Sequence, residues 1–259
     1  MLLCIDVGNS QLCCGIFHNQ QLILQFRYDT KNIGSSDELG IFILSVLREN
    51  QIDTQLISKI GVSSVVPSID YTIRAFCIKY FKLTPIFLQI DLITNINIKT
   101  KYPHEVGSDL IAAAIAGVNL YPEQSLIIFD LGTATTCSYI DQEGSLIGVA
   151  ITPGMRLMMS ALQNNTAKLF GVDFVAPKYI IGNTTKLAIQ SGLYFTQLGF
   201  IKEMITQINL DYRLIMQPIV IGTGGFSQLF ANTNIFTHMI PELVLLGIKY
   251  VLEPVSRNS

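Results

Sequence analysis

The sequence predicts an α/β protein built from two similar domains, and three observations lead to this prediction. The chain has 259 residues, which is enough for two domains of about 120 residues each. An apolar run that ends in an acidic residue and a glycine turn occurs twice, with Asp6 and Gly8 in the first copy and Asp130 and Gly132 in the second, 124 positions later. Each copy opens a series of short strand-like segments that is followed by helical periodicity.

In the first half, the alternation of apolar and polar residues predicts strands at 2–6, 11–17 and 21–28 that are joined by tight polar turns. A helix is expected at 36–49, where Ser36 can cap the start and Asp37 and Glu38 favour the positive end of the helix dipole. The remaining elements are a strand at 62–66, a helix at 69–81, a strand at 85–90 and an alanine-rich helix at 108–120.

The second half repeats this order with strands at 126–130, 135–140 and 145–151, helices at 154–165 and 184–208, a strand at 218–222 and a last helix at 241–252. Three leading strands followed by alternating helices and strands are typical of the ribonuclease-H-like fold. Two such copies make the architecture of actin, hexokinase and the Hsp70 ATPase. We therefore expect ribonuclease-H-like domains at 1–121 and 122–259 with an interdomain cleft, and the last helix can pack back on the first domain.

Composition excludes several classes of function. The formal net charge is −2 and basic runs are missing, which argues against nucleic acid as a partner. Three histidines far apart in sequence argue against a histidine-rich zinc site. Five cysteines without a C-x-x-C pair indicate free thiols in a reducing cytosol. No run of about 18 apolar residues and no signal peptide are visible, so we expect a cytoplasmic protein without a membrane span.

The first acidic turn reads Asp6-Val7-Gly8-Asn9-Ser10. Gly8 allows a backbone conformation in which N–H groups face phosphate oxygens, and Asn9 and Ser10 can donate hydrogen bonds to phosphate. The Asp6 carboxylate repels phosphate, so its useful role is to hold magnesium, through water. By itself the segment also fits an ordinary hairpin turn.

Two further turns point the same way. Asp130-Leu131-Gly132-Thr133-Ala134-Thr135-Thr136 adds three threonine hydroxyls, although threonine is also common in strands for its β-propensity. Gly222-Thr223-Gly224-Gly225 follows a predicted strand, where glycines let the backbone approach a phosphate or a flat ring. Together the three turns predict a nucleotide site.

These turns, in this order, resemble those of the type III pantothenate kinases, and the resemblance covers nearly all of the chain. The glutamine–serine–glycine run and the threonine-rich second turn are far more specific than a single Asp-x-Gly. The other matching segments are Pro103 with Glu105-Val106-Gly107-Ser108-Asp109, Ile151-Thr152-Pro153-Gly154, Ala161-Leu162, Asn165-Thr166-Ala167-Lys168-Leu169, Ile181-Gly182-Asn183-Thr184-Thr185, Ala188-Ile189-Gln190-Ser191-Gly192 and Pro241-Glu242-Leu243.

The resemblance implies ATP-dependent phosphorylation of pantothenate to 4'-phosphopantothenate, the first step of coenzyme A synthesis. It implies a cytoplasmic homodimer that needs magnesium and a monovalent cation, potassium or ammonium. By position, Asp109 would be the general base and Asp130 would bind the monovalent cation. The ATP contacts would be Asp6, Val7, Gly8, Asn9, Ser10, Gln11, Leu12, Cys13, Gly132, Thr133, Gly224 and Gly225. The pantothenate contacts would be Tyr102, Gly107, Ser108, Asp109, Leu110 and, across the dimer interface, Thr185.

The chemistry of phosphoryl transfer agrees with these roles, since it depends on positioning and on charge neutralisation. An acid beside the attacking hydroxyl can accept its proton, which suits Asp109. Asp109 also fits a helix-terminal aspartate that only stabilises the helix dipole, and Glu105, one turn earlier, could compete for the base role.

The chain departs from the family pattern near Asp109. Leu110 stands where arginine is usual, Ala113 where asparagine is usual, and Thr100 where the family tyrosine falls; Thr196 and Phe170 replace a glycine and a proline. Leucine cannot bind a carboxylate or carbonyl as an arginine fork does. We therefore expect ATP binding to be retained and acceptor binding to be weakened or altered. The alternatives are a kinase with another acceptor, or a nucleotide-binding paralogue with weak catalysis and a regulatory role.

Overall fold

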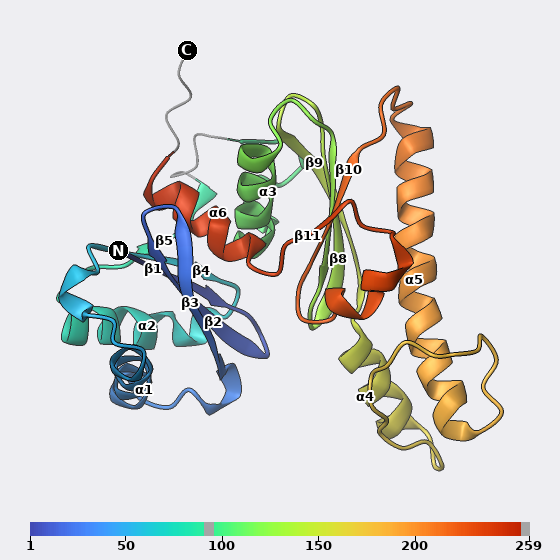
Figure 1. Ribbon diagram of the computed structural model, residues 1–259, viewed down its shortest axis with the longest axis horizontal. Coiled ribbons are helices and arrows are strands. Elements are labelled where there is room, and N and C mark those ends of the chain that lie inside the picture. The colour runs from blue at the N-terminus through green and yellow to red at the C-terminus, as the bar shows by residue number, and fades with distance from the viewer. Residues whose placement is uncertain (91–95, 255–259) are drawn as a thin grey trace. The chain divides into compact units, whose positions relative to one another are not determined.

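The computed structural model describes residues 1–90 and 96–254, and the chain divides into two compact units (Figure 1). Unit 1 comprises Met1–Ile96, Lys101–Leu120 and Leu243–Ser259, and unit 2 comprises Asn97–Thr100 and Tyr121–Glu242. None of the helices in the described ranges is both long and apolar enough to cross a membrane.

The sheet of unit 1 has the strand order β3-β2-β1-β4-β5, in which β1 (Leu2–Val7), β2 (Gln11–His18) and β3 (Gln21–Asp29) are antiparallel neighbours. Strands β4 (Lys59–Ser64) and β5 (Ile86–Phe87) continue the sheet in parallel from β1. Three antiparallel strands followed by parallel ones on the other side of β1 confirm the predicted ribonuclease-H-like order.

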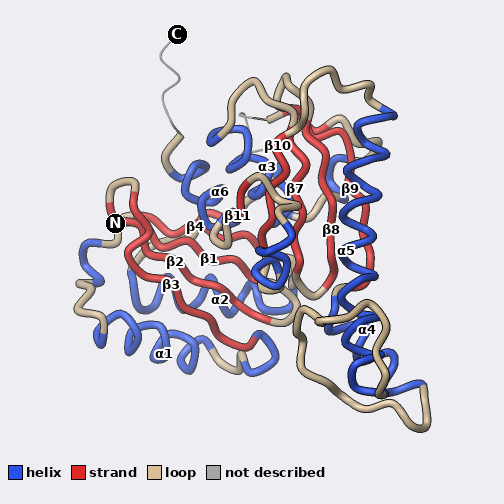
Figure 2. The backbone as a smooth tube through the Cα atoms, turned by 45° about the vertical axis from the view of Figure 1, so that its right-hand side comes forward, coloured by secondary structure: helices blue, strands red, loops and turns tan. Residues whose placement is uncertain are grey.

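Helices cover both faces of this sheet (Figure 2). On one face, α1 (Ser36–Glu49) and α2 (Asp70–Phe76) bury apolar side chains against β1, β2 and β4. On the other face, α3 (Ser108–Leu120) packs against α6 (Leu243–Leu252), and α6 contacts β1, β2 and β4. A Cβ on Gly247 would clash with the Ala112 backbone, so the two helices approach backbone to backbone.

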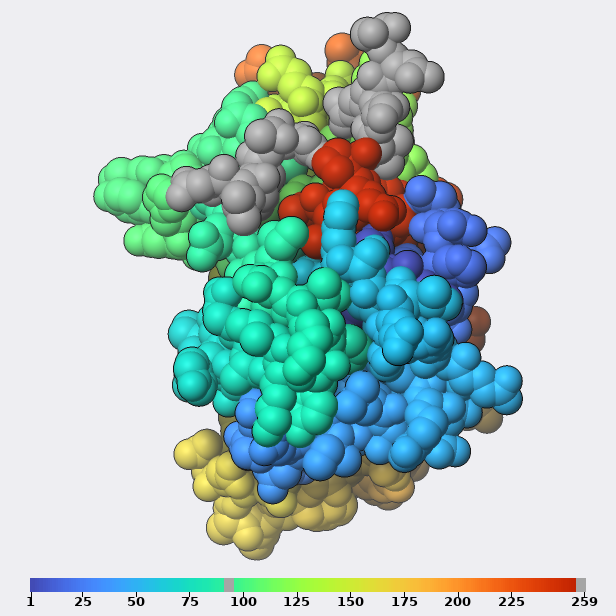
Figure 3. All heavy atoms as spheres, turned by 90° about the vertical axis from the view of Figure 1, so that its left-hand side faces the viewer, coloured from blue at the N-terminus to red at the C-terminus, as the bar shows by residue number. Residues whose placement is uncertain are grey.

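The last helix therefore belongs to unit 1, although Tyr121–Glu242 of unit 2 separates it from the rest of unit 1 in the chain. Gly61 in β4 and Gly15 in β2 leave room for the α6 side chains of Ile248 and Leu245. Figure 3 shows this end of the chain, in red, among atoms of the first 90 residues, in blue to teal. The C-terminal helix thereby completes the core of the N-terminal sheet.

Unit 2 repeats the strand order in the sheet β11-β10-β7-β8-β9-β6. Strands β7 (Leu126–Leu131), β8 (Ala134–Ile140) and β9 (Ser145–Pro153) are antiparallel, and β10 (Ile219–Thr223) and β11 (His238–Met239) run parallel to β7. The edge strand β6 (Asn97–Ile98) pairs with β9. Helices α4 (Met155–Asn165) and α5 (Thr185–Asp211) pack their apolar residues against β7 and β8.

Several predicted boundaries are wrong for local reasons. Ser35, not Ser36, caps α1, because Ser35 and Glu38 form a reciprocal capping box. Strand β4 covers 59–64 instead of 62–66, since only these residues pair with β1. The helix predicted at 69–81 is α2 at 70–76 followed by a π-helical turn at 77–81, and the strand predicted at 85–90 is only Ile86–Phe87. The two-residue strands β6 and β11 were not predicted; each is specified by its partner strand rather than by its own pattern.

Candidate active site

The first acidic turn is a tight hairpin between β1 and β2, and Asp6 lies at the end of β1. The Gly8 amide donates to the Gln11 carbonyl at 3.0 Å. Thr30, the first residue after β3, holds the turn, since its hydroxyl donates to the Gly8 carbonyl at 2.7 Å and its amide to the Ser10 carbonyl at 3.1 Å. Because the Gly8 amide is used inside the turn, an anion here would meet Asn9 and Ser10 instead. The role of Thr30 was missed, since no motif in the sequence marks it.

The residues around this turn differ in whether a ligand can reach their side chains. The side chains of Val7 and Leu12 are fully buried in the core, so only their backbones could contact a nucleotide. Gln11 is exposed and Cys13 is half-buried. Burial raises the pKa of the Cys13 thiol, whose sulfur accepts a hydrogen bond from Gln25 Nε2 at 3.2 Å. Cys13 is therefore a neutral thiol at pH 7 and not a reactive thiolate.

The predicted base, Asp109, lies in the first turn of α3, which is fixed to the end of β4. The Ser108 hydroxyl donates to the Ser64 carbonyl at 3.0 Å and lies 3.0 Å from the Ser63 hydroxyl. Ser63 is the β4 residue that pairs directly with Asp6 of β1. Within unit 1, the structure thus brings the start of the Asp109 helix next to the strand position that carries Asp6.

The environment of Asp109 suits a general base. Burial raises the pKa of its carboxyl, and a hydrogen bond from the Leu110 amide to Oδ1 at 2.8 Å opposes part of this effect. A raised pKa makes the carboxylate a better proton acceptor. Glu105, the competing candidate, is exposed on a 3₁₀ turn at Pro103–Glu105. A Cβ at Gly107 would lie 2.5 Å from Asp109 Oδ1, so glycine makes room for this carboxyl.

The other residues predicted to contact the acceptor are more scattered. The Tyr102 side chain is 56% exposed, with the Lys101 ammonium 5.2 Å from its ring centroid. Leu110 is half-buried beside Asp109, and Ala113 is buried in α3. Thr185 begins α5 in unit 2, where it lines an apolar pocket of about 560 Å³ between α4 and α5. The structure brings Ser108, Asp109 and Leu110 together and places Thr185 in the other unit.

The second acidic turn gathers three segments of unit 2 around Asp130. The Gly132 amide donates to the Ala134 carbonyl at 3.0 Å, and the Gly154 amide donates to the Thr133 carbonyl at 3.1 Å. Thr223 of β10 pairs with Asp130 in the sheet. Gly224 follows with φ +83°, and a Cβ there would clash with Asp130 Oδ1. The glycine turn at 222–225 therefore lies directly against the Asp130 carboxylate of the second acidic turn.

The oxygens at this turn fit a hard cation. Thr136 pairs with Asp130 across β7 and β8, and its hydroxyl oxygen is buried with no hydrogen-bond partner among the described residues. Carboxylate and hydroxyl oxygens are the ligands that hard cations prefer. Over residues 1–90 and 96–254, no three His, Cys, Asp or Glu side chains gather as a metal cluster. A cation at Asp130 would therefore depend on hydroxyl, carbonyl and ligand oxygens for its other contacts.

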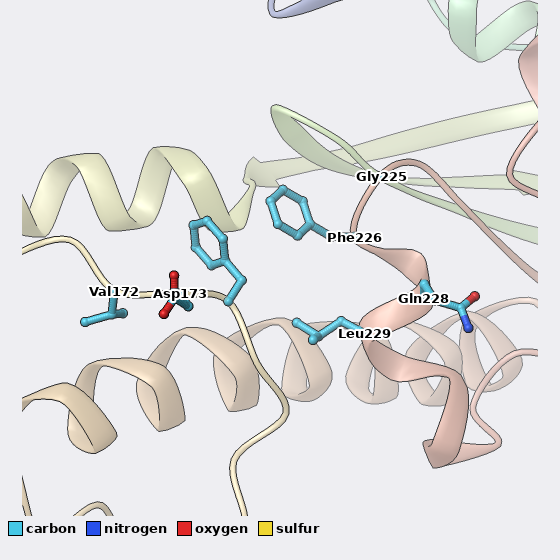
Figure 4. Close-up of a pocket in the computed structure, with 7 residues that line it drawn as sticks. Val172, Asp173, Gly225, Phe226, Gln228 and Leu229 are labelled. Atoms are coloured by element: carbon cyan, nitrogen blue, oxygen red, sulfur yellow. The ribbon is translucent and has the colours of Figure 1, made fainter. Parts of the chain in front are cut away.

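A pocket of about 630 Å³ opens beside the glycine turn (Figure 4). The rings of Phe174 and Phe226 meet edge to face, with centroids 5.0 Å apart. Gly225, which has no side chain, presents its backbone at the pocket wall. Flat apolar walls next to an open backbone turn can take a planar ring. The full lining is Val172, Asp173, Phe174, Gly225, Phe226, Gln228 and Leu229.

Comparison with known proteins identifies the family of this chain. A family model described as type III pantothenate kinase matches residues 2–207. The type III pantothenate kinase of Legionella pneumophila (strain Paris) is 45% identical over 249 residues, which cover 96% of this chain and 97% of that protein. This chain belongs to the type III pantothenate kinase family.

Solved structures of more distant proteins share the fold of this chain. A protein of Campylobacter jejuni described as a conserved Baf family transcriptional activator superposes with a TM-score of 0.61 at 20% identity, covering 96% of each chain. A protein of Sinorhizobium meliloti described as a 2-dehydro-3-deoxygalactonokinase superposes with a TM-score of 0.57 at 10% identity, covering 98% of this chain and 100% of that one. At these identities the likeness shows the fold alone, which is that of paired ribonuclease-H-like domains.

Proposed function

We propose that this protein transfers the terminal phosphoryl group of ATP to the terminal hydroxyl of pantothenate and forms 4'-phosphopantothenate. The observation that carries the proposal is the fixed position of Asp109: its helix begins at Ser108, which is bonded to the strand that pairs with the Asp6 strand. Membership of the type III pantothenate kinase family supplies the acceptor.

Asp109 accepts the proton of the attacking hydroxyl in this proposal. Its raised pKa is caused by burial, which favours taking up a proton as the new bond to phosphorus forms. Ser108 and Gly107 position this carboxylate, and Leu110 gives the acceptor an apolar neighbour where a guanidinium would bind polar groups. Tyr102 and Thr185 are proposed as further acceptor contacts.

ATP binding is assigned to the three turns. Asn9 and Ser10 donate hydrogen bonds to phosphate oxygens at the first turn, and Thr133 does so at the second. Gly224 and Gly225 leave the backbone open beside the pocket at Phe226, which we propose takes the adenine ring. Asp6 would hold magnesium through water, which neutralises charge on the phosphates when bound.

A monovalent cation, potassium or ammonium, is assigned to Asp130. The buried, unpartnered hydroxyl of Thr136 opposite Asp130 supports this assignment. Such a cation supplies fixed positive charge beside the phosphates when it is bound. The chain's own part is to position the Asp130 carboxylate, which lies so close to Gly224 that a Cβ there would clash with Oδ1.

We further propose a homodimer in the cytoplasm. Tyr179, Ile180 and Ile181 are 66%, 66% and 79% exposed on the segment before α5, which is unusual for large apolar side chains. Covering this segment with a second copy would place a partner next to Thr185, consistent with a contact across the interface. The five free cysteines support a reducing compartment.

An assay of ATP consumption with pantothenate, magnesium and potassium tests the proposed reaction. Product with the mass of 4'-phosphopantothenate is the expected result. Separate calorimetric titrations of ATP and pantothenate address the substitutions at Leu110 and Ala113. ATP binding with weak pantothenate binding would fit an altered acceptor site, and a screen of other alcohols would then identify the acceptor. ATP binding without turnover of any alcohol would favour a regulatory paralogue and refute the proposal.

A further inference from the structure

The proposed phosphate-binding turns contain no basic side chain. Lysine and arginine are absent from residues 6–13, 130–136 and 222–225. A triphosphate with one bound Mg²⁺ keeps a net negative charge, and positive side chains near its oxygens stabilise phosphoryl transfer. A cation from another element of the fold is therefore expected at these turns.

Sheet register places one arginine in line with Asp6. Asp6 of β1 pairs with Cys13 of β2, and Cys13 pairs with Arg27 of β3. Residues that are directly opposite in a sheet point to the same face, so the three side chains form one row across the strands. With strands about 4.8 Å apart, the Arg27 backbone is about 10 Å from that of Asp6.

The residue between them is small, which lets the arginine reach along the row. Arg27 is exposed on the edge strand β3, where it pairs directly with Cys13. Gln25, two residues earlier on the same face, also donates to Cys13 Sγ, at 3.2 Å. Gln25 thus reaches inward over β2, and Arg27 shares its face of the sheet with Cys13 and Asp6.

The acid next to Arg27 on the same face of β3 has a partner of its own. Asp29, the next acid on this face of β3, accepts the Lys31 amide at 3.0 Å as the cap of the turn that holds Thr30. A guanidinium carries five N–H donors, so most of its donors remain for an anion such as a phosphate group.

Resting on the proposed function, we infer that Arg27 binds a phosphate oxygen of the ATP at the Asp6 turn, reaching over Cys13 from the edge strand. In this role Arg27 supplies the positive charge that the turn itself lacks. It contacts the substrate directly, and Cys13 serves as the small residue that keeps the row open.

Calorimetric titration of Mg²⁺·ATP into wild type, Arg27→Met and Arg27→Lys tests the inference. We expect Arg27→Met to raise the Kd by about ten- to a hundredfold, as for the loss of a charged hydrogen bond. Arg27→Lys should recover part of the loss. Arg48→Met, the same change at an exposed position of α1, should leave the Kd unchanged.

A rescue variant separates phosphate binding from a structural role of Arg27. Adding Cys13→Lys to Arg27→Met returns a cation to the middle of the row and should restore most of the ATP affinity. An Arg27→Met Kd equal to that of wild type would overturn the inference. So would a weakened Kd that neither Arg27→Lys nor Cys13→Lys improves, because edge-strand packing would then explain it. Wild type that fails to bind Mg²⁺·ATP at all would instead refute the proposed function.

Discussion

The Ser63 hydroxyl lies 3.0 Å from the Ser108 hydroxyl, and this contact joins the strand beside Asp6 to the helix that carries Asp109. Ser108 gives its own proton to the Ser64 carbonyl, so Ser63 is the donor of the pair. Ser63 is fully buried and Ser108 is half-buried. The first turn of α3, which carries the proposed base Asp109, is therefore held by two hydrogen bonds.

Removing this link should cost both stability and turnover. Ser108→Ala leaves the Ser63 hydroxyl and the Ser64 carbonyl without their partner, which we expect to lower the free energy of unfolding by about 1–3 kcal/mol. In a double-mutant cycle with Ser63→Ala, the coupling energy in urea unfolding should be at least about 0.5 kcal/mol. Ser45→Ala, whose hydroxyl bonds only within α1, serves as the control. Strict additivity of Ser63→Ala and Ser108→Ala would show that the contact is not formed in solution.

Asp109→Asn should abolish most of the turnover while ATP binding is retained. The amide cannot accept the proton of the attacking hydroxyl, and loss of a general base lowers kcat by about 10²- to 10⁴-fold. Steady-state kinetics and ATP calorimetry on the same preparation provide the measurement. Glu105→Gln makes the same chemical change on the exposed neighbour and should alter kcat less than about threefold. If Glu105→Gln, and not Asp109→Asn, abolished most of the turnover, Glu105 would be the general base.

The pH profile should show the raised pKa of Asp109. The carboxyl must be ionised to act as a base, so kcat/KM should fall as the pH decreases through a pKa that lies above the ordinary aspartate value of 3.8. The residual activity of Asp109→Asn should lack this acid limb. Since the folded protein binds the proton more tightly than the unfolded chain, the stability of wild type relative to Asp109→Asn should also fall as pH rises through this range. A wild-type acid limb that persists in Asp109→Asn would assign it to another group.

Gly224→Ala should disrupt the second turn. A Cβ at this residue would clash with Asp130 Oδ1, and φ of +83° is unfavourable for any other residue. We expect a loss of about 1–3 kcal/mol in the free energy of unfolding and weaker ATP binding, measured by thermal unfolding and calorimetry. At Gly225 a Cβ would meet nothing within 4 Å, so Gly225→Ala should leave stability within about 0.5 kcal/mol. Equal stability of both variants would contradict the tight packing of Gly224 on Asp130.

The positions of the turns and of the helix at the candidate site could be predicted from sequence because their patterns are local. The turns at Asp6 and Asp130 combine an acid, a glycine and hydroxyl side chains within a few residues, so their position at strand ends follows from pattern alone. The helix at 108–120 was predicted with its observed bounds, because its alanine-rich apolar pattern and its preceding glycine agree. The repeated strand order of the two sheets likewise follows from element order and from the rule that three antiparallel strands precede the parallel ones.

The sequence by itself determined the family, the two-fold repeat of the sheet and the identity of the acidic residues, since these depend on short-range pattern. Only the tertiary structure decided which residues support them. Thr30 on the first turn, Ser63 under Asp109, Thr136 opposite Asp130 and Arg27 in line with Asp6 are separated in sequence from the groups they serve. Strand register and helix docking bring them together, and both are set by burial of the core, which no local motif encodes.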